Sequence, residues 1–465
     1  MTKEIKKEAV IIGAGLTGLS TAMYLKKQGV DCIVLEKSRQ PGGVIRTFSE
    51  KGFTYEAGPN TGVDNTFGVG DLFGMLSGYC KMEFADPSAK KRLIWKDGRW
   101  NALPQGPVQA VRTPLFTPGD KMRIMAEPFR RRGDSPQETL AGMVRRRLGE
   151  SFLKYAVDPF ISGIYAGDPE ELVTKYALPR LYRLEQEYGS FIIGALKKNL
   201  LEKGPRPSRR VFSAEGGFGR LIEGIENFVG KKNIICEVSD LTADKNREDY
   251  SVRFSSAGVE KRVSSPVLIS TLGAHSIEGV FGFISPEDIK VIEGLNYAPV
   301  IQIVLGFRDW KGMEINAFGG LVPSVENREI LGVLFPSAFL KNRAPAGGAL
   351  LNVFMGGVRK PGIIELSEQK ILGIAEREVS ELMQIPAFDP SLVKIFRYSH
   401  AIPQYGKDYT LRLEAIKRAE ANNRGFYLAG NIQGGIGMAD RIEQARCIAD
   451  KIISSRNPET TTAEL

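Results

Sequence analysis

Residues 9–36 read AVIIGAGLTGLSTAMYLKKQGVDCIVLE, and this stretch decides the fold. Residues 9–12 form a short, continuous apolar run of the kind found in strands buried inside a parallel sheet. A glycine-rich turn follows, then a helical stretch from Leu19 to Gln28, and a second apolar strand that ends at Glu36. The order of strand, glycine turn, helix and strand predicts a βαβ unit.

The glycine spacing in this unit indicates a dinucleotide-binding site. Gly13 permits the tight turn, Gly15 lets the backbone approach a pyrophosphate, and Gly18 allows the helix to pack closely on the strand. The helix N-terminus presents free N–H groups to the phosphates. Glu36 lies 23 residues after Gly13 and can accept hydrogen bonds from a ribose diol, which argues against NADP. The predicted contacts are Gly13, Ala14, Gly15, Leu16, Thr17, Gly18, Glu36 and Lys37.

Two further turns favour FAD over NAD as the dinucleotide. Residues 41–47, PGGVIRT, provide a second close backbone approach and a cation beside the same pyrophosphate. Residues 55–60, YEAGPN, form a glycine turn that can approach the ring system. The alternative for both is a glycine-rich surface turn without a ligand. The predicted contacts are Gly42, Gly43, Arg46, Ala57, Gly58, Pro59 and Asn60.

The C-terminal part of the chain carries a matching segment. Residues 425–430 read as a buried strand, and a glycine-rich turn then leads into a helix that starts near Gly437 and runs to about Ser454. A helix N-terminus placed beside the flavin would favour the negative charge that develops on reduction. A helix entry with only a structural role is the alternative. The predicted contacts are Gly430, Asn431, Ile436, Gly437 and Met438.

Composition excludes several other classes of protein. The hydrophobic share of 42% and the charged share of 25% are ordinary for globular proteins, and 465 residues suggest about three domains. The four cysteines form no CxxC pair and there are only two histidines, so we expect no disulfide framework and no metal site. No run reaches the length of a membrane span, and the polar opening MTKEIKKE is unlike a signal peptide, so we expect a cytoplasmic protein.

The net charge of +9 is concentrated in the middle of the chain. Residues 90–210 hold 24 Lys and Arg against 13 Asp and Glu, including the runs 130–132, 145–147 and 209–210. A basic surface interleaved with apolar segments, such as residues 191–201, can lie on an anionic bilayer. Nucleic acid is the competing partner, but no nucleic-acid-binding motif is present and we expect none to bind. A solvated, arginine-rich helical face is the remaining alternative.

Taken together, these motifs resemble those of the FAD-dependent amine-oxidase-like superfamily. The segments that carry the resemblance are GAGLTGL at 13–19, LEKSRQPGGVIRT at 35–47, YEAGPN at 55–60 and FYLAGN at 426–431, with QGGIGM at 433–438. Within the superfamily, GIYAGDP at 163–169 and IPQY at 402–405 are similar to the protoporphyrinogen oxidase family. The resemblance covers nearly all of the chain.

The resemblance implies an α/β (α+β) fold in three regions. The first is a Rossmann-like FAD-binding domain of the amine-oxidase and p-hydroxybenzoate-hydroxylase type. A mixed-sheet substrate domain and a helical membrane-associating region accompany it. The implied limits are 1–86, 208–285 and 398–465 for the FAD domain, 87–207 for the helical basic region and 286–397 for the substrate domain. Residues 298–307 and 349–357 read as strands of that last domain.

The implied activity is the six-electron oxidation of protoporphyrinogen IX to protoporphyrin IX, with molecular oxygen as acceptor and hydrogen peroxide as product. Implied partners are the inner face of the cell membrane, bound peripherally, a second copy in a homodimer, and a ferrochelatase or other chelatase. Three alternatives stay open: oxidation of coproporphyrinogen III, a carotenoid desaturase or amine oxidase of the same fold, and a flavin-binding scaffold without activity.

Carried over by motif, the resemblance assigns five substrate contacts. Arg92 would pair with a propionate, the carbonyl of Gly163 would face the ring nitrogens, and apolar side chains would flank the macrocycle. These apolar residues are Leu321, Leu334 and Phe354. Val238 would contact adenine through its backbone, and Tyr398 would face the flavin where some relatives have Trp. No side chain is assigned as a general base.

Overall fold

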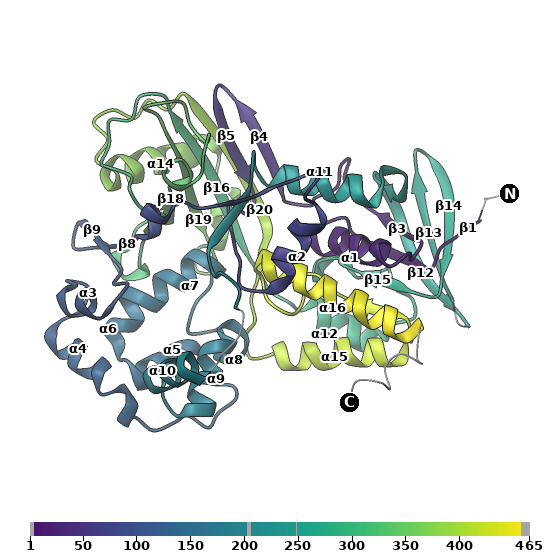
Figure 1. Cartoon of the computed structure of the whole chain (residues 1–465), viewed down its shortest axis with the longest axis horizontal. Helices are drawn as coiled ribbons and strands as arrows, with labels where there is room; N and C mark the ends of the chain where they lie inside the picture. Colours follow the sequence, from purple (N-terminus) through teal and green to yellow (C-terminus); the bar gives the residue numbers. More distant parts are fainter. Residues whose placement is uncertain (1–3, 202–205, 248, 457–465) are drawn as a thin grey trace.

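The computed structural model describes residues 4–201, 206–247 and 249–456. One body of the fold is built on a five-stranded, all-parallel sheet with the order β11-β3-β2-β15-β21, of which β3 and β15 are labelled on the right of Figure 1. The helix that connects the first two strands is α1 (Leu16–Lys27), so the predicted βαβ unit is confirmed. The strands are β2 (Ala9–Ile12), β3 (Cys32–Leu35), β11 (Ile234–Ile235), β15 (Leu268–Ser270) and β21 (Phe426–Leu428).

Both faces of this sheet are covered by apolar layers. One face packs against α1, α2 (Phe67–Met75), α11 (Phe218–Val229) and α16 (Met438–Arg456). The other packs against α12 (Pro286–Glu293), α15 (Tyr409–Asn422) and a four-stranded sheet. That sheet has the order β1-β14-β13-β12, formed by β1 (Glu4–Lys6), β12 (Val238–Asn246), β13 (Asp249–Ser256) and β14 (Val259–Ser265). Double coverage explains the uninterrupted apolar sequence of the central strands.

A seven-stranded mixed sheet forms the second body of the fold (Figure 1). Its order is β20-β16-β19-β18-β17-β8-β9, and α14 (Glu368–Leu382) packs on one face. The hairpin β8–β9 belongs to this sheet, although it falls in the segment predicted to be helical. The strands are β8 (Arg92–Lys96), β9 (Arg99–Ala102), β16 (Tyr297–Phe307), β17 (Gly319–Leu321), β18 (Ile330–Leu334), β19 (Ala349–Gly356) and β20 (Leu392–Pro403).

Smaller elements connect these bodies. A hairpin and a three-stranded sheet lie between them, formed by β4 (Arg46–Glu50) with β5 (Phe53–Ala57), and by β6 (Gly62–Val63), β7 (Met82–Phe84) and β10 (Val211–Ala214). A helical region follows β9, at the lower left of Figure 1. Its main helices are α3 (Pro107–Arg112), α4 (Pro118–Met125), α5 (Leu140–Arg147), α7 (Asp158–Tyr165), α9 (Pro179–Tyr188) and α10 (Phe191–Leu201).

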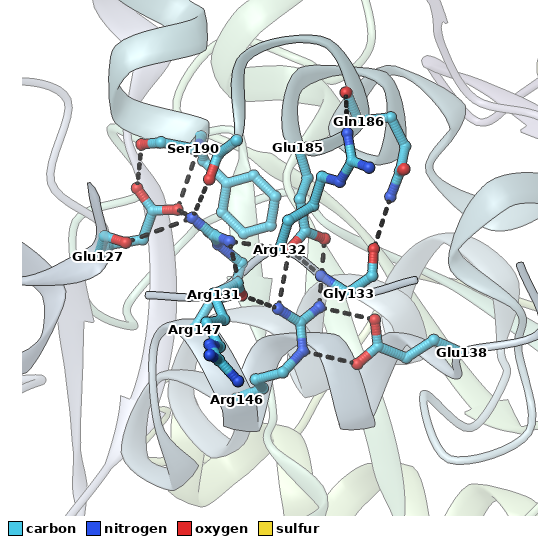
Figure 2. Close-up of polar contacts among 12 residues, drawn as sticks. Glu127, Arg131, Arg132, Gly133, Glu138, Arg146, Arg147, Glu185, Gln186 and Ser190 are labelled. Atoms are coloured by element: carbon cyan, nitrogen blue, oxygen red, sulfur yellow. Dashed lines mark hydrogen bonds and ion pairs between the residues drawn. The ribbon is translucent and has the colours of Figure 1, made fainter. Parts of the chain in front are cut away.

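A network of ion pairs and hydrogen bonds links separate segments of the helical region to one another (Figure 2). Arg147 and Glu127 are fully buried and in direct contact, with Arg147 Nε donating to Glu127 Oε1 at 2.6 Å. Arg146 and Arg147 each donate to Glu185 Oε1 at 2.8 Å. Part of the basic sequence expected on the surface is therefore paired inside the protein. Burial opposes the ionisation of Glu127, but hydrogen bonds from Ser190 and the Phe191 backbone outweigh it and lower its pKa.

Among the residues that the structure describes, no helix has the length and apolar character needed to cross a membrane. The residue limits of the FAD-binding domain, the helical basic region and the substrate domain stay predictions.

Candidate active site

The N-terminal glycine turn closes around the end of β2. Gly13 has a φ of +98°, and a Cβ on Gly18 would lie 1.9 Å from the carbonyl oxygen of Gly13. Gly15 has open space around its Cα, which leaves room for a close ligand. The carboxylate of buried Glu36 accepts hydrogen bonds from the backbone N–H of Ala14 at 2.7 Å and of Ser38 at 2.8 Å. The acidic side chain therefore lies beside the glycine turn that precedes α1.

The second glycine turn packs directly on the first. The N–H of Gly42 donates to the carbonyl of Ala14 at 2.8 Å, and a Cβ on Gly43 would lie 3.5 Å from Gly15 Cα. The Arg46 guanidinium donates to the Gly43 carbonyl at 3.4 Å. The two turns thus form a narrow backbone cradle that fits a pyrophosphate, and this geometry fits the FAD that the motifs predict.

The predicted adenine end lies next to Glu36. The N–H of Val238, the first residue of β12, donates to the Glu36 carbonyl at 3.0 Å. Lys37 is exposed beyond this point. Burial lowers the pKa of His275, which lies after β15, and the charges of His400 and Lys37 lower it further. The rings of His275 and His400 stack at 4.0 Å between centroids.

Two buried carboxamides hold the turn at residues 56–60. Gln302 of β16 accepts from the Gly58 N–H at 3.1 Å and donates to the Glu56 carbonyl at 2.7 Å. Asn352 of β19 donates to the side chain of Asn60. Gln302 and Asn352 are at most 1% exposed. Because both come from the seven-stranded sheet, that sheet sets the position of the turn.

Tyr398 of β20 lies beside the same turn. It is half-buried, and burial raises the pKa of its phenol to about 12 despite the opposing effects of Arg46 and the Gly58 backbone. Ala57 pairs with Arg46 across β4 and β5, and Pro59 follows Gly58 in the turn. The predicted residues 57–60, Arg46 and Tyr398 therefore converge in space.

The C-terminal turn, residues 430–437, adjoins the end of β21. The Gly430 N–H donates to Gln444 Oε1 at 2.9 Å, and Asn431 Oδ1 accepts from the Tyr297 hydroxyl at 3.3 Å. Arg441 of α16 is buried and donates to the carbonyls of Gly430 and Gln433, the latter at 2.9 Å. Ile436 packs against the core of the helical region, and α16 begins at Met438, directly after Gly437, as predicted.

Strand register places the predicted substrate contacts on one face of the seven-stranded sheet. Leu321 is opposite Gly332, which is opposite Phe354. Gly319 is opposite both Arg92 and Leu334. Opposed residues share a face and successive residues alternate, so the shared face holds Arg92, Leu321, Leu334 and Phe354, together with Gln302 and Asn352. The helix α14 covers the other face, so the candidate contacts are directed toward the FAD turns.

Helix α7 packs against this face of the sheet. A Cβ on Gly163 would lie 2.4 Å from Leu321 Cδ2, so helix and sheet are in direct contact at the glycine. Phe354 packs in a cluster with Ala166, one residue beyond the end of α7. Gly163 belongs to the last turn of α7, whose final carbonyls lack partners within the helix. Its carbonyl is therefore suited to accept a hydrogen bond from a ligand.

Arg92 places a cation on this face, beside the apolar residues. Its guanidinium lies 5.1 Å from the centroid of the Phe318 ring, and Phe318 packs with Leu334. Burial lowers the pKa of Arg92, but an arginine side chain stays charged. Within the described part of the chain Arg92 forms no ion pair with a carboxylate. A flat apolar surface beside an uncompensated guanidinium fits an aromatic or macrocyclic carboxylate.

The sequence patterns did not reveal the side chains that hold the turns in place. These are Gln302, Asn352, Arg441 and Tyr405, the last through its hydroxyl as a hydrogen-bond donor. A signal exists for two of them. Gln302 and Asn352 are single polar residues within the apolar runs 297–307 and 349–356. A polar residue inside a fully buried strand requires a partner. Among the described residues no group of three or more His, Cys, Asp or Glu is arranged to hold a metal ion.

Comparison with known proteins identifies the class. Residues 16–453 match the family described as flavin containing amine oxidoreductase, so the chain belongs to that family and is an FAD-dependent oxidoreductase. It is 28% identical over 482 residues to the mitochondrial protoporphyrinogen oxidase of Nicotiana tabacum, covering 96% of this chain and 95% of the relative. It is 24% identical to the coproporphyrinogen III oxidase of Bacillus subtilis (strain 168), covering 95% and 97%.

A solved structure shows the same fold. The crystal structure of a protein from Exiguobacterium sp. 255-15 superimposes with a TM-score of 0.79 at 21% identity, covering 96% of this chain and 98% of that one. The predicted fold class, a flavin-binding α/β architecture with a mixed-sheet second body, is therefore confirmed.

Proposed function

We propose that this oxidoreductase converts protoporphyrinogen IX to protoporphyrin IX. The observation that carries the proposal is the single sheet face on which Arg92, Leu321, Leu334 and Phe354 meet, directed toward the FAD turns. Such a face offers apolar contact to a flat macrocycle and one cation to a carboxylate. The similarity to protoporphyrinogen oxidases over almost the whole chain supports the same substrate.

In this proposal the protein binds and orients, and FAD, when bound, supplies the hydride acceptor. Arg92 binds a propionate through bidentate hydrogen bonds, which fixes the ring in its plane. Leu321 and Phe354 contact the macrocycle, and the Gly163 carbonyl accepts from a ring N–H. Six electrons and six hydrogens leave in three two-electron rounds, and three molecules of oxygen become three of hydrogen peroxide.

The alternative substrate is coproporphyrinogen III, which carries four carboxylates. Similarity to the Bacillus subtilis enzyme favours it. The higher identity to the protoporphyrinogen oxidase of Nicotiana tabacum, 28% against 24%, supports the choice of protoporphyrinogen IX. Purified holoenzyme supplied with each porphyrinogen under oxygen, and followed by porphyrin fluorescence, decides between them. A higher kcat/KM for coproporphyrinogen III would overturn the choice, and absence of turnover on both would overturn the proposal.

We also propose that the helical region binds the inner face of the cell membrane. Exposed apolar side chains gather on α3, α4 and the turn after α4: Val108 (65% exposed), Val111 (69%), Met122 (66%), Met125 (61%) and Phe129 (90%). Basic residues lie among them in the sequence, namely Arg112, Lys121, Arg123 and Arg130. Apolar side chains that insert and cations that meet anionic headgroups are the two features of a peripheral surface.

Liposome flotation tests the membrane proposal. Wild-type holoenzyme should float with vesicles that contain anionic lipid and release at high salt. Replacing Phe129 and Met122 by Ser should abolish flotation, whereas Val259→Ser on β14, which is 57% exposed, serves as the matched control. Equal flotation of all three proteins would overturn the assignment of this surface.

A further inference from the structure

Two consecutive residues after β20 contact different parts of the active site. The Gln404 side chain donates from Nε2 to the Tyr165 carbonyl at 2.9 Å. The Tyr405 hydroxyl lies 2.9 Å from the carbonyls of both Asn431 and Gly435. One dipeptide therefore contacts both the end of α7 and the C-terminal turn.

Gln404 stabilises the end of the helix that carries Gly163. Helix α7 ends at Tyr165, and Ala166 then adopts a left-handed conformation with a φ of +47°. The Tyr165 carbonyl is one of the terminal carbonyls that need a partner outside the helix. A Cβ on Gly167 would lie 2.6 Å from Gln404 Oε1, so the amide fits against the backbone only because residue 167 is glycine.

Tyr405 stabilises the turn 430–437, which is predicted to contact the flavin. Its side chain is 1% exposed, and its ring stacks on Tyr409 at 4.3 Å between centroids. Burial raises the pKa of the phenol well above its usual range, so it stays a neutral donor. The turn has positive φ at Gly430, Gly434 and Gly435, and such a glycine-rich segment needs side-chain contacts to keep one conformation.

We propose that Gln404 and Tyr405 are positioning residues that set the separation between the substrate helix α7 and the flavin turn 430–437. The inference rests on the proposed function, because it concerns the approach of the substrate to the flavin. Hydride transfer requires reacting atoms at about 3–3.5 Å, and a displacement of 1 Å can cost about 10²-fold in rate. The strand that precedes the dipeptide belongs to the substrate-facing sheet, which gives the pair a rigid base.

The two halves of the dipeptide predict different defects. Tyr405→Phe removes one hydroxyl and preserves the ring, so it should shift the flavin absorption bands, the reduction potential and the rate of FAD release, with KM close to wild type. Gln404→Leu should leave the flavin spectrum unchanged, raise KM and lower kcat. It should also speed amide hydrogen exchange at residues 163–168. Gln404→Glu, which keeps the size but loses the N–H donor, should behave as Gln404→Leu does.

The experiment compares these variants as holoenzymes with two matched controls. Tyr427→Phe, on β21 before the turn, and Gln369→Leu, exposed on α14, should resemble wild type in every measurement. An unchanged flavin spectrum and potential in Tyr405→Phe, or unchanged exchange at 163–168 in Gln404→Leu, would overturn the proposal. Identical defects in the two variants would also overturn it. The flavin spectrum, the reduction potential and the hydrogen exchange need no substrate, so a failure of the proposed porphyrinogen activity in wild type is recognised separately.

Discussion

Replacing Arg92 tests the substrate assignment most directly. The guanidinium lies against Phe318 and pairs with no carboxylate among the described residues, so Arg92→Ala breaks no internal ion pair. A hydrogen bond to a charged group contributes about 1.5–3 kcal/mol, which corresponds to about 10- to 150-fold in kcat/KM. We expect a loss in that range for protoporphyrinogen IX, with normal FAD content.

The assay is porphyrin fluorescence under oxygen, with two substrates. In the dimethyl ester both propionate carboxylates are neutral methyl esters, so the ester lacks the charge that Arg92 would meet. Wild type should prefer the diacid by about the factor that Arg92→Ala loses, and the variant should use both substrates equally. Arg99→Ala, an exposed arginine on the neighbouring strand β9, is the matched control. An equal loss on diacid and ester would refute the reasoning, because the contact would then not be with a carboxylate.

Three further predictions follow from packing and charge. Gly163→Ala should slow flavin reduction by about 10²-fold, as measured by stopped flow. The reason is that the new Cβ would lie 2.4 Å from Leu321 Cδ2 and displace this residue of the substrate surface. A wild-type rate would contradict this. Arg147→Met should lower the free energy of unfolding, measured in urea, by about 3 kcal/mol, because the buried carboxylate of Glu127 loses its cation. Replacing the exposed Arg145 by Met should change the free energy of unfolding little. Folding lowers the pKa of Glu127 below 4.5, so its ionised form stabilises the protein above about pH 4.5, and this contribution is lost as the pH falls further. Melting curves from pH 3 to 7 should show this loss in wild type and a smaller one in Glu127→Gln.

Local sequence patterns were sufficient for the FAD-binding elements. The strands, the glycine turns and α1 follow from neighbouring residues, because a tight turn and a close helix contact leave few choices of residue. The C-terminal turn and the start of α16 were predicted for the same reason. The structure then packs the turn at 42–43 on the turn at 13–15 and places Gly58 against Val44, while Gly13 and Gly430 both adjoin Thr271.

Long-range pairing could not be predicted in the same way. The run at 145–147 appeared as a basic surface, but Glu127, Glu138 and Glu185, which come from separate segments, pair with Arg146 and Arg147, and Arg147 is fully buried. The strands β8 and β9 looked like part of the helical region, but β8 pairs with β17 across more than 200 residues. The charges in a sequence segment do not determine whether its side chains are exposed or buried in the folded protein.

The five-stranded sheet has a consequence for the synthesis of the chain. Its first two strands emerge from the ribosome early, while β21 and α16 are translated last. At about 5–20 residues per second, roughly 20–80 s separate the first glycine turn from the last one. Throughout that interval the nascent polypeptide exposes apolar strand surface and has no finished coenzyme pocket. The complete coenzyme pocket can therefore form only after β21 and the turn 430–437 have been translated, and a product truncated upstream of Gly430 lacks that turn.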